Sequence, residues 1–370
     1  MEKVINEEFL IRQFKDSDLP EFKELLKTSW NENHIFLKSE ELMLWQYKGY
    51  GRNSGMHFPT LFDKDGRMIG FRGVYPAEIN IPTEGGIKRE DLAIGALYLV
   101  IPEYRGKKLG LALQQFTQEC YGNYLAIGSN LGTSAPIYRK SNYLMMDGMH
   151  RYIAPLNKQF SSLLVDKEYE VPFWSNIDNK PQAKEINISA SELEIIWNES
   201  PCSKMLSINK SEDFWNWRYK NHPIYKYFFF GGKEEGGLIV GRVCNLYDDD
   251  LNKKESTIFR ILEIIPEGGT FCSEKLSGLL TGVIQWADNY GCSMVEAYLT
   301  TERFSKLLYG NGFTQLSLEE SKRLVSNYEP MATSPKLTNV SMYLGGSEYR
   351  DFDSIYVSLA DSDQDRPNIV

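Results

Sequence analysis

The chain has 370 residues, enough for two domains of ordinary size, and its 42% hydrophobic and 13% aromatic content is that of a globular protein. The formal net charge of −9 at pH 7 disfavours nucleic acid or an anionic membrane as a partner, except through a local basic patch. The five cysteines form no C-x-x-C pair and no run of about 18 apolar residues occurs, so we expect a cytoplasmic chain without zinc, disulfides or a membrane span.

The first half of the chain alternates between patterns typical of strands and helices. In chain order we expect a strand and an amphipathic helix (9–30), a hairpin with its turn at Lys64-Asp65-Gly66 (58–81), a strand (91–101), a helix (110–122), a strand (124–130), a short helix (134–142) and a strand (143–156). This series predicts one α/β unit of about 150 residues.

Three stretches of the first half recur, in the same order, in the second half. They are SEELMLWQYK (39–48) with SEDFWNWRYK (211–220), VIPEYRG (100–106) with IIPEGG (264–269), and IYRKSNY (137–143) with LLYGNGF (307–313). The repetition indicates two similar α/β domains in tandem. The expected organisation is a first domain (1–156), a crossing segment (157–190), a second domain (191–345) and a solvated acidic tail (346–370).

An apolar strand-like run ends in a basic turn that contains glycine. Arg105, Lys107 and Lys108 supply positive charge, and Gly106 and Gly110 let the backbone approach a ligand closely. The helix expected after this turn adds unpaired N–H groups and a favourable dipole. The pattern therefore predicts a site for a diphosphate, whereas the alternative interpretation is a solvated start of a helix.

This turn, the order of the surrounding elements and the later stretch IYRKSNY together resemble the GCN5-related N-acetyltransferase (GNAT) superfamily. The phosphate signature of that family is Arg or Gln, two residues, Gly, one residue, then Gly or Ala, and here Lys108 stands where the first glycine is usual. The resemblance implies two tandem GNAT-like domains, each a mixed, mostly antiparallel sheet flanked by helices, with the second domain degenerate. It implies acetyl-CoA or another short acyl-CoA as co-substrate, and no metal. The residues that it assigns to acyl-CoA are Leu99, Val100, Arg105, Gly106, Lys107, Lys108, Leu109, Gly110 and Asn130.

The resemblance also implies direct attack of an amine on the thioester, without an acyl-enzyme. The backbone amide of Leu99 or Val100 is expected to polarise the thioester carbonyl, and Tyr138 to donate a proton or hydrogen bond to the sulfur of CoA. His34 is the first candidate for the base, because it lies in the region that covers the acceptor in this fold and an imidazole accepts a proton near neutral pH. The alternatives are Asp147, His150, His222 and an ordered water.

A tandem arrangement with one intact CoA half is similar to the GNAT acyltransferases of nucleotide-linked amino sugars, such as dTDP-3-amino-3,6-dideoxyhexoses. Those enzymes serve bacterial surface polysaccharides, including lipopolysaccharide O-antigen and capsule. We expect the acceptor between the halves and CoA in the first half only, since no basic residue directly follows IIPEGG. Trp45 and Tyr47 are candidates for stacking on the sugar, with core packing as the alternative. The rival functions are N-acetylation of a small amine or amino acid, aminoacyl transfer in cell-wall synthesis, and non-catalytic sensing of acyl-CoA.

Overall fold

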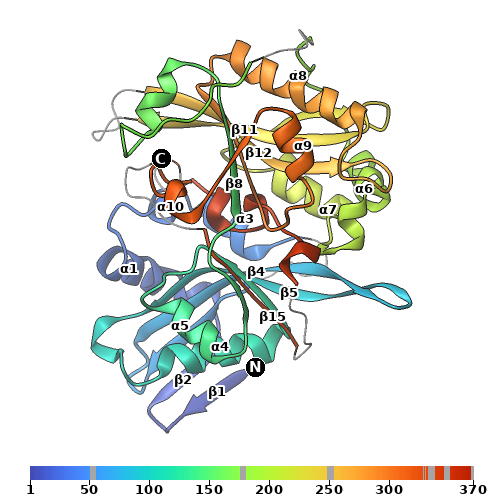
Figure 1. Cartoon of the computed structure of the whole chain (residues 1–370). Coiled ribbons are helices and arrows are strands. Elements are labelled where there is room, and N and C mark those ends of the chain that lie inside the picture. The colour runs from blue at the N-terminus through green and yellow to red at the C-terminus, as the bar shows by residue number, and fades with distance from the viewer. Residues whose placement is uncertain are drawn as a thin grey trace.

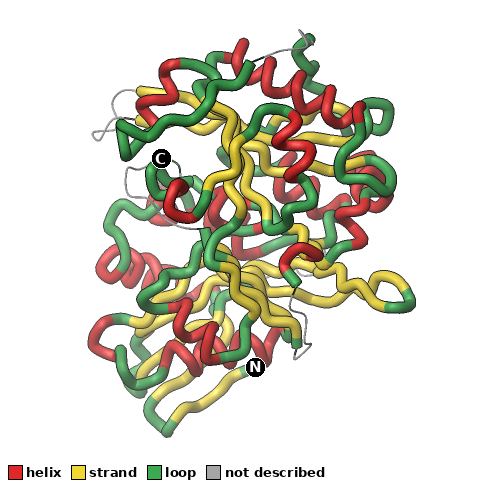
Figure 2. Tube along the Cα trace, in the orientation of Figure 1, coloured by secondary structure: helices red, strands yellow, loops and turns green. Residues whose placement is uncertain are grey.

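The computed structural model describes residues 1–50, 56–175, 181–247, 254–327, 329, 331, 338–345 and 351–367. Within these residues, ten strands form one mixed sheet, sheet 1, and six strands form a second, sheet 2. Figures 1 and 2 show strands in the middle of a lower and an upper half of the molecule, with helices packed around them. The expected α/β fold with two mixed sheets flanked by helices is confirmed.

Sheet 1 is built mainly from the first 150 residues. In spatial order its strands are β1 (Glu2–Ile5), β2 (Phe9–Gln13), β3 (Pro59–Asp63), β4 (Met68–Thr83), β5 (Gly86–Val100), β6 (Asn123–Ile127), β15 (Val340–Leu344) and β7 (Leu144–Met146), and β9 (Leu206–Ile208) and β16 (Ile355–Tyr356) extend it from β4. Neighbouring strands are antiparallel except for β5 with β6 and β9 with β16. The hairpin predicted between β3 and β4 is confirmed, and Gly66 adopts a φ of +80° in its turn.

Sheet 2 repeats this order with strands from the second half of the chain and one from the first. In spatial order they are β10 (Phe228–Gly232), β11 (Gly237–Tyr247), β12 (Lys254–Pro266), β13 (Met294–Leu299), β8 (His150–Pro155) and β14 (Thr314–Leu316). Its parallel pair is β12 with β13, which corresponds to β5 with β6. The matching strand order supports the duplication that the repeated stretches predicted.

Helices connect the strands in corresponding places. The α-helices are α1 (Leu19–Ser29), α2 (Ile35–Lys38), α3 (Glu40–Lys48), α4 (Leu109–Tyr121), α5 (Ser134–Lys140), α6 (Ala190–Glu199), α7 (Glu212–Trp215), α8 (Glu274–Tyr290), α9 (Ser305–Gly310) and α10 (Leu318–Ser321). Tighter or wider turns are η1 (Asp16–Asp18), η3 (Pro102–Tyr104), η4 (Lys158–Leu163), η5 (Pro201–Lys204), η6 (Asn216–Lys220), η7 (Phe352–Ser354), η8 (Leu359–Asp361) and η9 (Asp363–Asp365). α4 follows β5 and α8 follows β12, and each packs an apolar face on its sheet.

Each half of the chain contributes a strand to the sheet of the other half. β8 pairs with both β13 and β14 of sheet 2, and β15 pairs with both β6 and β7 of sheet 1. Figure 1 shows β8 running up into the upper half and β15 running down into the lower half. The single strand expected over 143–156 is therefore two strands, β7 and β8, in different sheets. Sheet 1 therefore takes β15 from the expected second domain (191–345), and sheet 2 takes β8 from the expected first domain (1–156).

Equivalent tryptophans of the repeated stretches meet each other between the two halves. Trp45 of α3 and Trp217 of η6 stack with ring centroids 4.9 Å apart and an interplanar angle of 18°. The Trp45 Nε1–H donates to the Trp217 carbonyl (3.0 Å), and the Trp217 Nε1–H donates to the Trp45 carbonyl (2.9 Å). Ser39 and Ser211 cap their helices in the same way. The pair is locally symmetric, as expected for two copies of one motif.

Residues 355–367 of the C-terminal segment are buried except for the half-buried Asp363, which corrects the expectation of a solvated acidic tail for this part of it. In Figure 1 this segment passes between the two halves. Asp361 is 1% exposed and lies 2.7 Å from the ammonium of Lys210. Asp365 is wholly buried and pairs with Arg218 at 3.0 Å and with Arg242. The counter-charges come from distant parts of the chain, so the sequence of the tail by itself gave no sign of them. Of this stretch, residues 346–350 and 368–370 lie outside the described residues.

Candidate active site

The parallel pair of sheet 1 separates partway along its length. β5 and β6 pair from Leu92 with Asn123 to Gly95 with Ala126, and β5 then continues to Val100 beside β4 alone. The Ile101 N–H donates to the Ile69 carbonyl of β4 (3.0 Å). Because amide direction alternates along a strand, the Leu99 N–H also faces β4 and the Val100 N–H faces the opening. Of the two amides expected to polarise a thioester, the geometry favours that of Val100.

A buried arginine, which the sequence analysis missed, fills the inner end of this opening. Arg72 lies at a bulge in β4 and is 2% exposed. Its Nη1 donates to the Ala96 and Leu97 carbonyls of β5, both at 3.3 Å, and its Nη2 donates to the Tyr138 hydroxyl at 2.7 Å. Gly95 makes room for it, since a Cβ there would lie 2.1 Å from Nη2. The signal available in the sequence was an Arg in an otherwise apolar strand, next to Gly73.

Tyr138 of α5 lies beside Arg72, and its hydroxyl is held in place by hydrogen bonds. It is 1% exposed, and its hydroxyl lies 3.4 Å from that of Tyr124. Burial raises the pKa of Tyr138, and the charge of Arg72 opposes this shift. The phenol is therefore protonated at neutral pH, and because its oxygen accepts from Arg72, its own hydrogen remains available to donate.

The basic turn lies at the N-terminus of α4 and is exposed to solvent. Gly106 adopts a φ of +84° and Lys108, which caps the helix, a φ of +62°. This left-handed conformation explains why glycine is usual at the position of Lys108, and keeping a lysine there costs about 1 kcal/mol. Arg105 Nε donates to the Val100 carbonyl (3.0 Å), which fixes the turn to the end of β5.

The start of α4 is aligned with the strand opening. The Tyr98 hydroxyl of β5 donates to the Gly110 carbonyl, while Leu109 is buried and anchors the first turn. The exposed Lys107 ammonium lies 5.2 Å from the ring centroid of Tyr104. The first amides of α4 have no partner within the helix and point out of its N-terminus, beside three basic side chains. This arrangement suits a diphosphate.

Asn130 lies in the loop between β6 and α5, across the opening from β5. Its Oδ1 accepts from the Gly132 N–H (2.8 Å) and its carbonyl accepts from the Ala135 N–H (3.0 Å). It therefore shapes the loop that carries α5 and Tyr138, and its own side chain is exposed.

The corresponding opening in sheet 2 is filled by protein. β12 pairs with β13 only as far as Ile261 with Ala297. Beyond that point, the Tyr356 hydroxyl of the C-terminal segment accepts from the Ile264 N–H (3.2 Å) and donates to Glu263 (2.8 Å). The repeated stretch places Leu308 where the first half has Tyr138. The second half therefore has neither the hydroxyl nor the open strand edge.

The histidine expected to be the base has a structural role. His34 is 6% exposed and caps α2, its Nδ1 accepting from the Phe36 N–H at 3.2 Å. Burial, with the charge of Arg366, lowers the pKa of His34 to about 3. Since such an imidazole is a weak base near neutral pH, we correct the expectation that His34 takes the proton of the acceptor.

The alternative bases also have structural partners. His222 Nδ1 accepts from the backbone amides of Ile224 (3.1 Å) and Tyr225 (3.0 Å). His150 begins β8 in sheet 2, and the exposed Asp147 pairs with Arg139 at 3.4 Å.

The aromatic residues proposed for sugar stacking belong to the core. Tyr47 is wholly buried against Phe36 and Phe58, and one face of Trp45 is covered by Trp217. This corrects the expectation that Trp45 and Tyr47 stack on a substrate and confirms the alternative, core packing.

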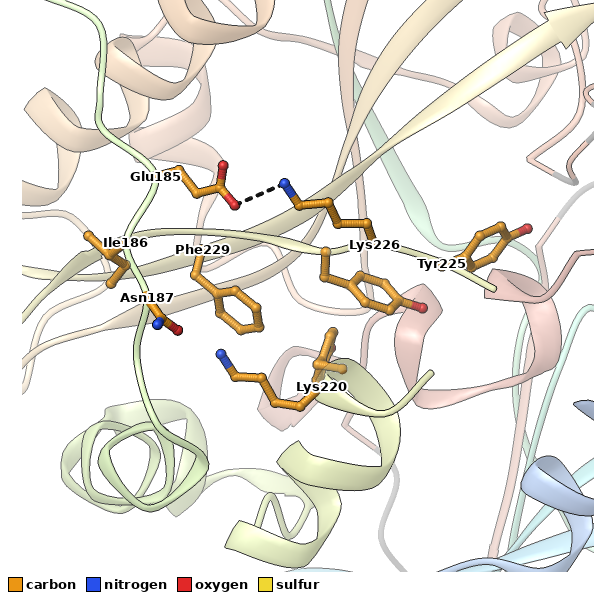
Figure 3. A pocket seen from close by; sticks show the side chains of 9 residues that line it. Glu185, Ile186, Asn187, Lys220, Tyr225, Lys226 and Phe229 are labelled. Atoms are coloured by element: carbon orange, nitrogen blue, oxygen red, sulfur yellow. Dashed lines mark ion pairs between the residues drawn. The ribbon is translucent and has the colours of Figure 1, made fainter. Parts of the chain in front are cut away.

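A cavity of about 490 Å³ lies at the edge of sheet 2 (Figure 3). It is lined by Glu185, Ile186, Asn187, Tyr219, Lys220, Tyr225, Lys226, Tyr227 and Phe229. The Lys220 ammonium lies 4.1 Å from the centre of the Phe229 ring, and burial lowers the pKa of Lys220. Lys226 pairs with Glu185 at 3.3 Å. The cavity combines aromatic surface with positive charge, on elements other than β5 and α4.

The described part of the chain contains neither a membrane-spanning helix nor a cluster of metal-binding side chains. No helix in the described ranges is long and apolar enough to cross a membrane. In the same part of the chain, no group of three or more His, Cys, Asp or Glu side chains is placed to hold a metal ion.

No protein-family model and no curated protein matches this sequence. Solved structures do resemble the fold. A GCN5-related N-acetyltransferase from Anabaena variabilis has a TM-score of 0.52 at 11% identity, over 91% of this chain and 73% of that one. A probable N-acyltransferase from Enterococcus faecalis has a TM-score of 0.51 at 9% identity, over 93% and 73%. N-myristoyltransferase from Saccharomyces cerevisiae, solved with myristoyl-CoA, has a TM-score of 0.50 at 12% identity, over 92% and 83%. At these identities the likeness concerns the fold, and it shows that this chain has a GNAT-like fold.

Proposed function

We propose that this protein is an acyl-CoA-dependent N-acyltransferase whose acyl-CoA site lies in the first half of the chain. The observation that carries the proposal is the opening between β5 and β6, which lies next to the exposed basic turn at the start of α4. The equivalent opening of sheet 2 is occupied by Tyr356. One of the solved structures with this fold holds an acyl-CoA, which supports the choice of co-substrate.

In this proposal each element of the site has one task. The first amides of α4, with Arg105, Lys107 and Lys108, bind the diphosphate of CoA. The pantetheine pairs with the open edge of β5, where the Val100 N–H polarises the thioester carbonyl. The amine attacks the carbonyl carbon directly, and Tyr138 donates its hydrogen to the departing sulfur.

For the acceptor we propose the amino group of a nucleotide-linked amino-deoxy sugar, such as a dTDP-3-amino-3,6-dideoxyhexose. The support is the tandem arrangement with one intact half, and the position of the opening beside the junction of the two halves. A nucleotide-linked sugar is much larger than its reacting amine, so it needs contacts beyond one small pocket to hold that amine near the thioester.

The test is release of free thiol from acetyl-CoA and other short acyl-CoAs in the presence of candidate amines. The panel contains nucleotide-linked amino sugars, free amino sugars, amino acids and polyamines. Thiol release that is fastest with a nucleotide-linked sugar supports the full proposal. Release with small amines alone supports an acyltransferase but contradicts the nucleotide-linked sugar as its acceptor. Tight binding of acyl-CoA without turnover of any amine contradicts an enzyme.

A further inference from the structure

The C-terminal turn η9 lies next to the opening between β5 and β6. Gln364 Nε2 donates to the carbonyl of Ile127, the last residue of β6, at 3.0 Å. Gly128 allows this approach, because a Cβ there would lie 2.5 Å from the Gln364 side chain. β5 and β6 separate just before this point, at Gly95 with Ala126. The residue before Gln364, Asp363, is therefore brought to the mouth of the opening.

Asp363 differs from the other carboxylates of this segment. Asp361 and Asp365 each have a basic partner within 3.0 Å. For Asp363 the contacts in the described chain are longer: Arg366 Nη1 lies 3.9 Å from Oδ2, and Gln364 Nε2 lies 3.4 Å from Oδ1. Its side chain is 10% exposed. The Asp363 carboxylate can therefore accept hydrogen bonds from a cationic group that enters through the opening.

The groups that face Asp363 come from its own segment and from several elements of the first half. They are Arg366 of the same segment, Arg72 and Tyr75 of β4, Tyr47 of α3 and Tyr138 of α5. Burial raises the pKa of Asp363, and the charges of Arg366 and Arg72 oppose the shift. A carboxylate with a raised pKa is a better proton acceptor near neutral pH than an exposed Asp.

We propose that Asp363 binds the protonated amine of the acceptor and takes its proton, acting as the general base of the acyl transfer; this inference rests on the function proposed above. The ammonium gives one proton to the Asp363 carboxylate, and the amine lone pair then forms the C–N bond to the thioester carbonyl carbon. The C–S bond breaks, Tyr138 gives its hydroxyl proton to the departing thiolate, and the second proton of the nitrogen passes through solvent to the Tyr138 oxygen. Asp363 returns its own proton to water.

The experiment replaces Asp363 by Asn in the full-length chain, with Asp351→Asn as the matched control. Asp351 is an exposed carboxylate of the same segment, bonded to Ser354. Binding of acyl-CoA is measured by calorimetry, stability by thermal unfolding, and kcat/KM for thiol release from about pH 5 to 9, with the best amine from the panel. Asp363→Asn is expected to bind acyl-CoA within about twofold of wild type and to lower kcat/KM by about 10²-fold or more.

The pH profile separates a base from a merely structural residue. In wild type, kcat/KM should fall on the acid side with an apparent pKa above the ordinary Asp value of about 4. In Asp363→Asn the remaining rate should rise with pH in step with the free amine in solution. If Asp363→Asn is less stable than wild type, Asp363→Glu distinguishes a general base from a structural residue. This variant keeps the carboxylate, so its kcat/KM should exceed that of Asp363→Asn by at least about tenfold.

Three results overturn the inference, and they are distinguishable. If wild type turns over and Asp363→Asn keeps kcat/KM within about threefold with the same pH profile, Asp363 is not the base and the proposed function stands. If wild type binds acyl-CoA but releases no thiol with any amine, the proposed function is wrong, and so is the assignment of Asp363 as its general base. An equal loss in Asp351→Asn also rejects a specific role for Asp363.

Discussion

Replacing Tyr138 by Phe tests two roles of its hydroxyl, the hydrogen bond with Arg72 and the proposed proton transfer to the departing thiolate. The phenol oxygen accepts from Arg72 Nη2 at 2.7 Å, and both side chains are almost fully buried. Removing the oxygen leaves a buried guanidinium N–H without this partner, which should lower the free energy of unfolding by roughly 1–3 kcal/mol. If the same hydroxyl also donates to the departing thiolate, kcat should fall by about 10²-fold while KM for acyl-CoA changes little.

Tyr143→Phe is the matched control for this variant. The Tyr143 ring lies 4.8 Å from that of Tyr138, and its hydroxyl accepts from Gln114 Nε2 at 2.6 Å in an equally apolar place. Urea unfolding should show a loss of similar order in both variants, and single-turnover thiol release should show a rate loss in Tyr138→Phe alone. If Tyr138→Phe loses stability but turns over within about threefold of wild type while chemistry limits the rate, the hydroxyl only holds Arg72 and the proposed proton transfer is refuted.

Three further expectations concern phosphate binding, pH and the junction of the halves. Arg105→Ala should weaken acyl-CoA binding by roughly 1–3 kcal/mol in calorimetry, and an unchanged Kd would remove Arg105 from the diphosphate site. The pKa of His34 is lowered to about 3, so the unfolded chain binds more protons below about pH 6.5, and the unfolding free energy should decline on acidification towards pH 3. His34→Asn keeps a capping side chain and should make this decline shallower in urea titrations, whereas an identical slope contradicts the assignment. Trp45→Phe and Trp217→Phe should each lower the free energy of unfolding by about 1 kcal/mol. The double variant should lose less than the sum of the two single losses, and a loss equal to that sum would argue against coupling across the junction.

The sequence predicted the features of this protein that are local. The hairpin at Lys64-Asp65-Gly66, helix α4 and the basic turn before it depend on residues within a few positions of one another. The duplication was also visible, because SEELMLWQYK and SEDFWNWRYK keep the same cap and the same aromatic spacing. Each of these short patterns contains the residue that causes the local structure, such as a glycine with a left-handed backbone or a serine that caps a helix.

The features that were missed depend on partners far away in the chain. Arg72 was overlooked because its acceptors, at Ala96, Leu97 and Tyr138, lie 24 or more positions away. The tail was expected in solvent because Lys210 and Arg218, which neutralise its aspartates, lie about 140 to 150 positions earlier. His34 was assigned to catalysis from its residue type and its place in the sequence, while its burial and its bond to Phe36 depend on how α2 packs. In each case the prediction depended on tertiary contacts, which the neighbouring sequence does not reveal.

The reciprocal strand exchange also determines when this protein can fold during its synthesis. β6 and β7 have no strand between them until residues 340–344 leave the ribosome, although the other strands of sheet 1, apart from β9 and β16, are made within the first 150 residues. During most of translation, a nascent chain therefore displays open strand edges in its N-terminal half and an unpaired β8, both of which favour wrong pairing with other chains. Fragments that terminate between residues 140 and 340 should for this reason be clients of chaperones and proteases, even though they contain every residue of the proposed acyl-CoA site.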